Sequence, residues 1–359
     1  MLHAELGYMP ATEMAARIRA KSLSPVEAVG AVLARIEAVD PKVNAFAHLA
    51  PEAAMAAARA AQAALMGGGP IGPLHGVPVT IKDLAITKDM PTQFGTLMLK
   101  GNQPTEDTTM VTRLKAAGAI VIGKTTTSEY GWTGVSRSPL TGITHNPWKH
   151  GYNAGASSAG AGAASAAGFG PIHQGSDGAG SIRMPSHFCG VFGLKPSFGR
   201  VPAYPVTGGD FTSHNGPMTR SVADAALFMA VTAGPHPDDH TSLEAWPADY
   251  AARLHDGVRG KRIAYSSDLG HARVDPEVAA LVAAAAKRFA ELGATVEQVT
   301  PPWGTLGPEL GRLFWPAHLT RLSAKLPEWE GRMDPGLVAC IRAGQAVTME
   351  AYQLARDRK

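Results

Sequence analysis

Short apolar segments alternate with helical segments through the middle of the chain, and this alternation restricts the fold more than any other feature. Apolar runs at residues 77–81 and 119–122 are typical of strands, and the patterns at 108–117 and 158–168 indicate helices. The alternation continues with further expected elements: a Ser221-capped helix to about Ala233, a strand at 262–265, a helix at 276–292 and a strand at 294–299. Such alternation predicts an α/β fold in which helices flank a sheet.

The N-terminal residues 1–66 are expected to be helical. Ser24-Pro25-Val26-Glu27 is a capping box with proline at the first helical position, and apolar residues recur behind it at helical spacing. This helix is expected to break at Asp40-Pro41, and an alanine-rich helix is expected at 51–66. The first part of the chain is therefore predicted to contain helices alone.

Residues 67–300 form the predicted α/β core with the candidate functional motifs, and residues 301–359 read as helices only. No repeat, low-complexity linker or clear boundary divides the sequence. A single domain over residues 1–359 is therefore expected.

The charge pattern and the cysteine content exclude several classes of protein. The net charge is only +3, and the basic residues are scattered rather than grouped into a nucleic-acid footprint. No apolar run approaches the length that crosses a membrane. The two cysteines, Cys189 and Cys340, lie far apart, which argues against a disulfide framework and suits a reducing compartment. We expect a cytoplasmic protein without a membrane or direct nucleic-acid partner.

Two motifs that suggest a bound cofactor or metal fail on closer reading. Gly118–Thr125 fits the Walker A pattern, but its internal residues form an apolar strand-like run instead of a phosphate-binding loop. His236 and His240 are four residues apart, but Pro237 and Asp238 between them disfavour a helical metal-binding face. Neither a metal nor a cofactor is predicted.

A run of small residues, Gly178-Ala179-Gly180, precedes Ser181. Small residues allow unusual backbone dihedrals and a close approach of the main chain to another group. The run therefore predicts that main-chain N–H groups face a phosphate, a substrate carbonyl or simply another strand.

Lys82 ends the apolar segment 77–81. Most lysines extend along the surface and keep the ammonium group in water. A lysine buried at a strand end would instead have a lowered pKa, and its neutral amine would accept a proton from a serine hydroxyl. Both interpretations follow from the residue alone.

Three stretches of the sequence resemble the amidase signature family. They are Gly76–Asp83, Asn153–Gly168 and Gly175–Pro185, and the spacings between Lys82, Ser157 and Ser181 agree with the family arrangement. The resemblance extends from about Ala11 to the C-terminus, and further matching text stands at Gly123–Glu129, Asn146-Pro147-Trp148, Cys189–Pro196 and Gly216–Asp224.

The resemblance implies an amidase signature fold, with a mixed central sheet flanked by helices on both faces. It implies hydrolysis of a carboxamide through an acyl-enzyme on Ser181, with Ser157 as the bridging serine and Lys82 as the base. Metal and cofactor play no part in this chemistry. The implied partner is a small-molecule amide substrate, and a homodimer is compatible with the resemblance.

The same resemblance assigns supporting roles to residues around the nucleophile. The backbone N–H groups of Gly178, Ala179, Gly180 and Ser181 would form the oxyanion hole. Ser158 would hydrogen-bond within the site. Asp177 and Arg183 would brace the loop as buried charge partners.

The chain departs from the family pattern in two ways, and one family feature would be costly here. Ala156, Ala159 and Ala179 stand where the family commonly has glycine. The family's bridging serine follows a cis peptide bond, which before Ser157 would cost about 3–4 kcal/mol. The strands that usually follow the equivalent of Lys359 are absent from this sequence, so part of a sheet edge and of the pocket floor is expected to be missing.

Two alternative functions remain open. The first is the glutaminase (A) subunit of a tRNA-dependent amidotransferase, although Met184 stands where that subunit commonly has glutamine. The second is a catalytically silent, truncated homologue. The substrate is not specified by the motifs; the aromatic candidates for a pocket wall, for which core packing is the more common role, are Trp132, Tyr204, Phe211 and Trp315.

Overall fold

The computed structural model describes residues 2–205, 212–246 and 249–358, so Phe211 lies outside the described residues. The chain forms two compact units. The first comprises residues 1–251 and 325–338, and the second comprises residues 252–324 and 339–359. The single domain expected over residues 1–359 stays a prediction.

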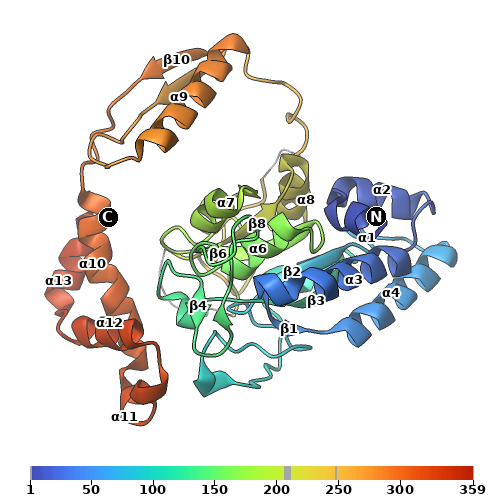
Figure 1. Ribbon diagram of the computed structural model, residues 1–359, viewed down its shortest axis with the longest axis horizontal. Helices are drawn as coiled ribbons and strands as arrows, with labels where there is room; N and C mark the ends of the chain where they lie inside the picture. The colour runs from blue at the N-terminus through green and yellow to red at the C-terminus, as the bar shows by residue number, and fades with distance from the viewer. Residues whose placement is uncertain (1, 206–211, 247–248, 359) are drawn as a thin grey trace. The chain divides into compact units, whose positions relative to one another are not determined.

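A six-stranded mixed sheet forms the centre of the first unit (Figure 1). The spatial order is β1-β3-β2-β6-β8-β7; β2 runs parallel to both β3 and β6, whereas β1, β8 and β7 pair antiparallel with their neighbours. The strands are β1 Phe46–Leu49, β2 Pro78–Lys82, β3 Ile120–Thr125, β6 Ile172–Asp177, β7 Phe192–Gly193 and β8 His214–Thr219, and a separate hairpin pairs β4 Arg137–Ser138 with β5 Gly142–Ile143.

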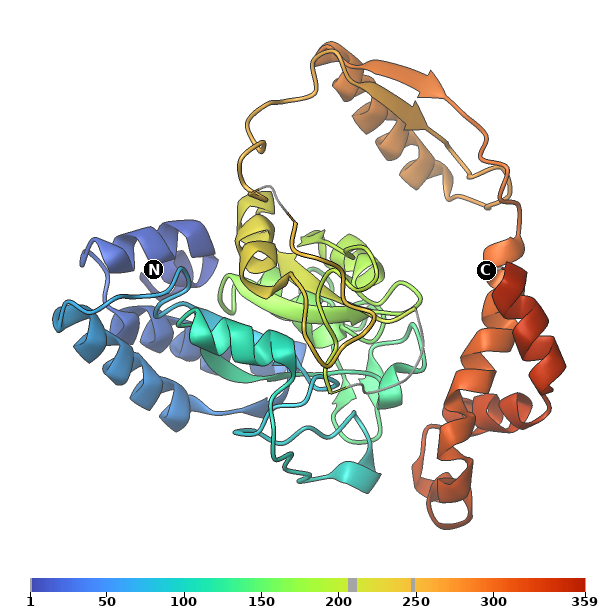
Figure 2. The ribbon, with the colours of Figure 1, turned by 180° about the vertical axis from the view of Figure 1, so that it is seen from behind.

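Helices cover both faces of this sheet. One apolar cluster joins Ile120 and Ile122 to α3, α4 and α6. A second cluster joins Val79 and Ile81 to α2, α5 and α8, and Figure 2 shows α8 (yellow) on the face opposite to that seen in Figure 1. The helices of the first unit up to residue 251 are α1 Leu2–Tyr8, α2 Ala11–Arg19, α3 Pro25–Val43, α4 Pro51–Met66, α5 Thr109–Ala116, α6 Ala159–Ala167, α7 Arg183–Cys189 and α8 Val222–Thr232. The predicted α/β fold is confirmed.

The second unit is built around a strand-helix-strand segment. β9 (Arg262–Tyr265) and β10 (Thr295–Gln298) pair in parallel with each other, and α9 (Pro276–Glu291) connects them. These strands were expected in the α/β core, but among the described residues they form a sheet of their own. Beyond Pro301 the regular elements of the described residues are helices, as predicted: α10 Leu306–Leu319 and α13 Met349–Arg358 belong to the second unit, α11 Leu326–Trp329 to the first, and α12 Pro335–Gln345 to both.

Two local expectations for the N-terminal region were wrong. α3 continues through Pro41 to Val43 and ends at Asn44, which has a left-handed conformation. Pro41 is exposed and lies in the last turn of α3. Because proline has no N–H group, the carbonyl group four residues earlier lacks its usual partner, and on this exposed face it bonds water instead. Residues 1–66 are also not purely helical, because β1 pairs with β3 at the edge of the central sheet.

The parallel strands β2 and β6 are inner strands of the sheet, and they bring two distant parts of the sequence together at their carboxyl ends. β2 is buried along its whole length and ends at Lys82, and β6 ends at Asp177. Since both strands run in the same direction, their carboxyl ends lie together. Among the described helices, none combines the length and the apolar character needed to cross a bilayer.

We expect Gly160→Ala to destabilise the protein by about 1–3 kcal/mol, because no side chain fits at this position of α6. A Cβ atom on Gly160 would lie 2.4 Å from both the Ala45 carbonyl oxygen and the Thr126 nitrogen. Gly30→Ala in α3 is the matched control, since its Cβ would meet only Met55 Cε at 4.0 Å. Helix propensity alone should make this control about 0.5–1 kcal/mol more stable. Urea unfolding midpoints of the two variants check the prediction; equal midpoints would contradict it.

Candidate active site

The Lys82 side chain is fully buried and its amine lies among hydroxyl groups. Its Nζ is 2.7 Å from Ser157 Oγ, 2.9 Å from Ser158 Oγ and 3.0 Å from Ser176 Oγ. Ser157 and Ser158 immediately precede α6, so the sheet edge supplies the amine and the start of a helix supplies two of the hydroxyls. The surface interpretation of Lys82 is therefore wrong, and the buried interpretation is confirmed.

Burial lowers the pKa of Lys82 to about 7, and the negative charge of Asp177 opposes this shift only in part. The partners of Nζ are hydroxyl groups and the Ser176 carbonyl oxygen, and no carboxylate contacts it among the described residues. A substantial fraction of Lys82 is consequently neutral near pH 7, and the neutral amine is able to accept a proton.

Ser181 lies next to Ser157 and is buried, with 9% of the residue exposed. The Ser157 backbone N–H donates to Ser181 Oγ at 3.3 Å. The cis peptide bond expected before Ser157 is not present: within the described residues the cis bond joins Tyr204 and Pro205, and Ala156–Ser157 is trans. The trans form avoids the energetic cost of a non-proline cis bond. Lys82 thus contacts the Ser157 hydroxyl and Ser181 Oγ contacts the Ser157 backbone, so the three expected residues lie together.

The loop that carries Ser181 is organised around the carboxylate of Asp177. Asp177 Oδ1 accepts a hydrogen bond from the Gly180 N–H at 2.7 Å, and Oδ2 accepts one from the Ile182 N–H at 3.0 Å. Gly180 is therefore not a free oxyanion donor as expected, because its N–H is already used within the loop. The N–H groups of Gly178, Ala179 and Ser181 have no acceptor among the described residues.

Arg183 completes the arrangement around Asp177, with Nη2 at 2.9 Å from Oδ1 and Nε at 3.0 Å from Oδ2. Burial alone would raise the pKa of Asp177, but the hydrogen bonds from Arg183, Gly180 and Ile182 outweigh it and hold the pKa well below its usual range. The expectation of buried charge partners holds for Asp177 but not for Arg183, whose side chain is 57% exposed. Its guanidinium reaches the carboxylate from the solvent side.

Two polar residues of β6 belong to the site and were not predicted. Ser176 holds Nζ of Lys82 through its hydroxyl, and Ser158 Oγ donates to the Ser176 carbonyl oxygen at 3.1 Å. Gln174 Oε1 accepts the backbone N–H of Lys82 at 3.0 Å. Alternate residues of a strand share a face, so an assigned strand at 172–177 would have placed Gln174 and Ser176 together.

A second buried lysine, Lys124, stands on β3 beside the site and was also not predicted. Its Nζ donates to the Ala85 carbonyl oxygen at 2.6 Å and to Thr92 Oγ1 at 2.7 Å. Burial lowers its pKa, while burial raises the pKa of the nearby Asp83. Asp83 directly follows Lys82, the last residue of β2. Lys124 and Asp83 therefore hold in place the segment that continues from this strand. Across the described ranges, no group of three His, Cys, Asp or Glu side chains is placed to hold a metal ion.

This geometry defines a class of site: a buried amine with a lowered pKa, a serine hydroxyl bonded to it, and a second serine on an adjoining loop with free backbone amides, on an α/β scaffold. The comparisons with known proteins agree with that class. Residues 27–321 match the family described as Amidase. The chain therefore belongs to the amidase family.

Individual relatives place the chain within this family. It is 40% identical to an acylamidase of Rhodococcus erythropolis over 97% of this chain and 74% of that protein. It is also 40% identical to the glutamyl-tRNA(Gln) amidotransferase (A) subunit of Chloroflexus aggregans, over 83% of this chain and 61% of that relative. The chain thus spans less than two thirds of the latter relative.

Solved structures show the same fold. A bacterial aryl acylamidase of the amidase signature family matches with a TM-score of 0.89 and 31% identity, over 97% of this chain and 74% of that one. The peptide amidase from Stenotrophomonas maltophilia matches with a TM-score of 0.87 and 30% identity, over 98% of this chain and 78% of that one. The predicted amidase signature fold is confirmed.

We expect Asp177→Asn to lower the free energy of unfolding by about 2–3 kcal/mol. The amide NH₂ would face N–H donors that now bind a carboxylate oxygen, and the charge of Arg183 would lose its partner. Asp89→Asn is the control, because Asp89 is exposed and its ion pair with Lys115 should contribute less than about 1 kcal/mol. Chemical denaturation at pH 7 measures both values; a loss no larger than that of the control would show that Asp177 does not organise the loop.

Proposed function

We propose that this protein hydrolyses a carboxamide to a carboxylate and ammonia or an amine, with Ser181 as the nucleophile. The observation that supports this most strongly is the fully buried Lys82 amine, 2.7 Å from Ser157 Oγ. A serine hydroxyl is a weak nucleophile until a base takes its proton. Lys82 is the only group so placed among the described residues around Ser157, and its pKa of about 7 suits that task.

The proton passes through a hydroxyl relay in this proposal. Neutral Lys82 accepts the proton of Ser157 Oγ while Ser157 Oγ accepts that of Ser181 Oγ, which requires the Ser181 hydroxyl to turn from the Ser157 N–H toward the Ser157 side chain. Ser181 Oγ then attacks the substrate carbonyl carbon. The relay afterwards returns the proton to the leaving nitrogen as the C–N bond breaks, and a water molecule hydrolyses the acyl-enzyme by the same route.

The negative charge on the carbonyl oxygen is stabilised by backbone amides. We assign this role to the N–H groups of Gly178, Ala179 and Ser181, which have no other acceptor among the described residues. One such donor typically contributes about 3–4 kcal/mol to the transition state. Ser158, Ser176 and Asp177 hold the amine and the loop in place.

A second candidate function is the glutaminase subunit of a tRNA-dependent amidotransferase, because several relatives carry that name. Met184 in place of the glutamine expected there favours a stand-alone amidase. Glutamine hydrolysis that appears only with added partner subunits would favour the amidotransferase instead. A small-molecule amide substrate, a cytoplasmic location and a homodimer stay predictions.

Ser181→Ala and Lys82→Ala should each abolish amide hydrolysis without unfolding the protein, and Ser157→Ala should severely impair it, since each change breaks the relay. Ser165→Ala is the matched control: its hydroxyl is buried in α6 and has no partner in the part of the chain that the structure describes, so its loss should leave activity unchanged. Turnover of a small panel of aliphatic, aryl and amino-acid amides measures the effect, and a fluorophosphonate probe should label the wild-type protein at Ser181. Normal activity of the Ser181 variant would refute the assignment, and absence of a labelled serine would indicate the silent homologue.

The value of kcat/KM for an uncharged anilide should rise with pH and level off above about 7. Below this pH Lys82 carries a proton and cannot accept another, so the rate should fall about tenfold per pH unit. The sign follows from burial, which lowers the pKa of Lys82 to about 7 and leaves the reactive neutral form above it. A profile that stays flat between pH 5.5 and 9, or that declines through pH 7, would exclude Lys82 as the base.

A further inference from the structure

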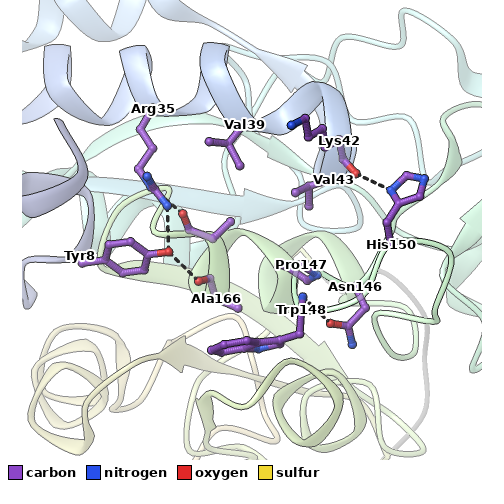
Figure 3. A pocket seen from close by; sticks show the side chains of 11 residues that line it. Tyr8, Arg35, Val39, Lys42, Val43, Asn146, Pro147, Trp148, His150 and Ala166 are labelled. Carbon is purple, nitrogen blue, oxygen red and sulfur yellow. Dashed lines mark hydrogen bonds between the residues drawn. The ribbon is translucent and has the colours of Figure 1, made fainter. Parts of the chain in front are cut away.

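A cavity with a volume of about 530 Å³ lies in the first unit, apart from the proposed catalytic side chains. None of its lining residues belongs to the catalytic series described above (Figure 3). A space of this size is in the range of small-molecule sites. The lining residues are Tyr8, Arg35, Val39, Lys42, Val43, Asn146, Pro147, Trp148, His150, Ala166 and Ala167.

One side of this cavity is a single face of α3. Arg35, Val39, Lys42 and Val43 are spaced so that they lie along one stripe of the helix. Ala166, at the end of α6, lies opposite this stripe in Figure 3. The valine and alanine side chains make the interior of the cavity apolar, while the two cations stand on the helix that borders it.

Trp148 is 75% exposed, and a hydrogen bond anchors its indole ring. Its indole Nε1 donates to the Cys189 carbonyl oxygen at 2.7 Å, and its backbone N–H donates to Asn146 Oδ1 at 3.0 Å. A large aromatic surface held in this way loses little conformational entropy when a ligand packs on it. The indole therefore offers a rigid flat surface at the cavity.

The charged groups at the cavity are all of one sign. Arg35 Nε donates to the Ala167 carbonyl oxygen at 2.7 Å, and Nη2 donates to Tyr8 Oη at 2.8 Å, so this guanidinium also caps the C-terminal end of α6. Among the described residues, neither Arg35 nor Lys42 forms an ion pair with a carboxylate, and the lining contains no Asp or Glu. The cavity thus combines apolar walls with two cations that have no carboxylate partner among the described residues.

We propose that this cavity binds a small organic anion with a flat aromatic ring, of the class of aromatic carboxylates. The ring packs against Trp148 and the apolar wall of α3, and the carboxylate faces Lys42, while Arg35 adds positive charge at the other end of the cavity. Stacking on an aromatic surface and a charge-assisted hydrogen bond supply complementary parts of the affinity. The site is one of binding only, and it is separate from the hydrolysis proposed above.

The test is calorimetric titration of naphthalene-2-carboxylate into the full chain carrying Ser181→Ala. This background removes the proposed nucleophile, so the result does not depend on the proposed hydrolysis. Trp148→Ala and Lys42→Glu, each added to that background, should weaken binding by about tenfold. Uncharged 2-methylnaphthalene should bind more weakly than the carboxylate.

Lys149→Glu is the matched control. Lys149 follows Trp148 in the chain and is exposed, but its Nζ lies 4.4 Å from the centre of the Tyr152 ring and it does not line the cavity. The same change of charge at this position should leave the affinity within about twofold. Binding that is unaffected by both cavity variants, or that falls equally in the control, would overturn the proposal, as would an absence of binding to the parent chain. Circular dichroism checks that each variant is folded. Among the described residues, Lys42 makes no side-chain hydrogen bond, so Lys42→Glu changes the charge at the cavity without breaking such a bond.

Discussion

The removal of the Lys82 amine from water is the interaction on which the rest of the site depends. Three hydroxyl groups and a carbonyl oxygen replace its hydration shell, and none of them neutralises its charge. The protein thereby keeps a lysine whose protonation changes near neutral pH, where an exposed lysine would be charged. Neither the serine hydroxyls nor the amides of the loop would form a site for acyl transfer without this base.

The sheet topology explains how residues so distant in sequence meet. Parallel pairing of β2 with β6 places Lys82 beside Ser176 and Asp177, and α6 begins directly after Ser157 and Ser158. Gly160 permits this position of α6, because the backbone of Ala45 and Thr126 occupies the space of a side chain. The glycine and alanine residues of this segment thus serve close packing as much as chemistry.

Much of this was predictable from the sequence, and the failures have physical causes. Helices with clear caps, such as α3 at Ser24 and α8 at Ser221, were predicted at their observed starts, and the proposed catalytic residues were assigned through the family resemblance. β6 was missed because its polar residues obscure the apolar alternation of a strand; Gln174 and Ser176, for example, bind Lys82 instead of facing solvent. Two details depend on local backbone geometry, which residue types alone do not specify. They are the hydrogen bond from the Gly180 N–H to Asp177 and the trans peptide bond before Ser157. Lys124 resembles a surface lysine in sequence, since the three oxygen atoms that bind its amine come from a separate loop.

Asp177 links two properties that are usually adjusted separately. The same carboxylate that shapes the loop through Gly180 and Ile182 also attracts the proton on Lys82. A natural or engineered variant that reshapes this loop by replacing the aspartate would therefore shift the working pH of the enzyme toward acid as well, because the protonated amine would lose the negative charge that stabilises it. A substitution of Asp177 therefore changes both the conformation of the loop and the pH range in which Lys82 is neutral.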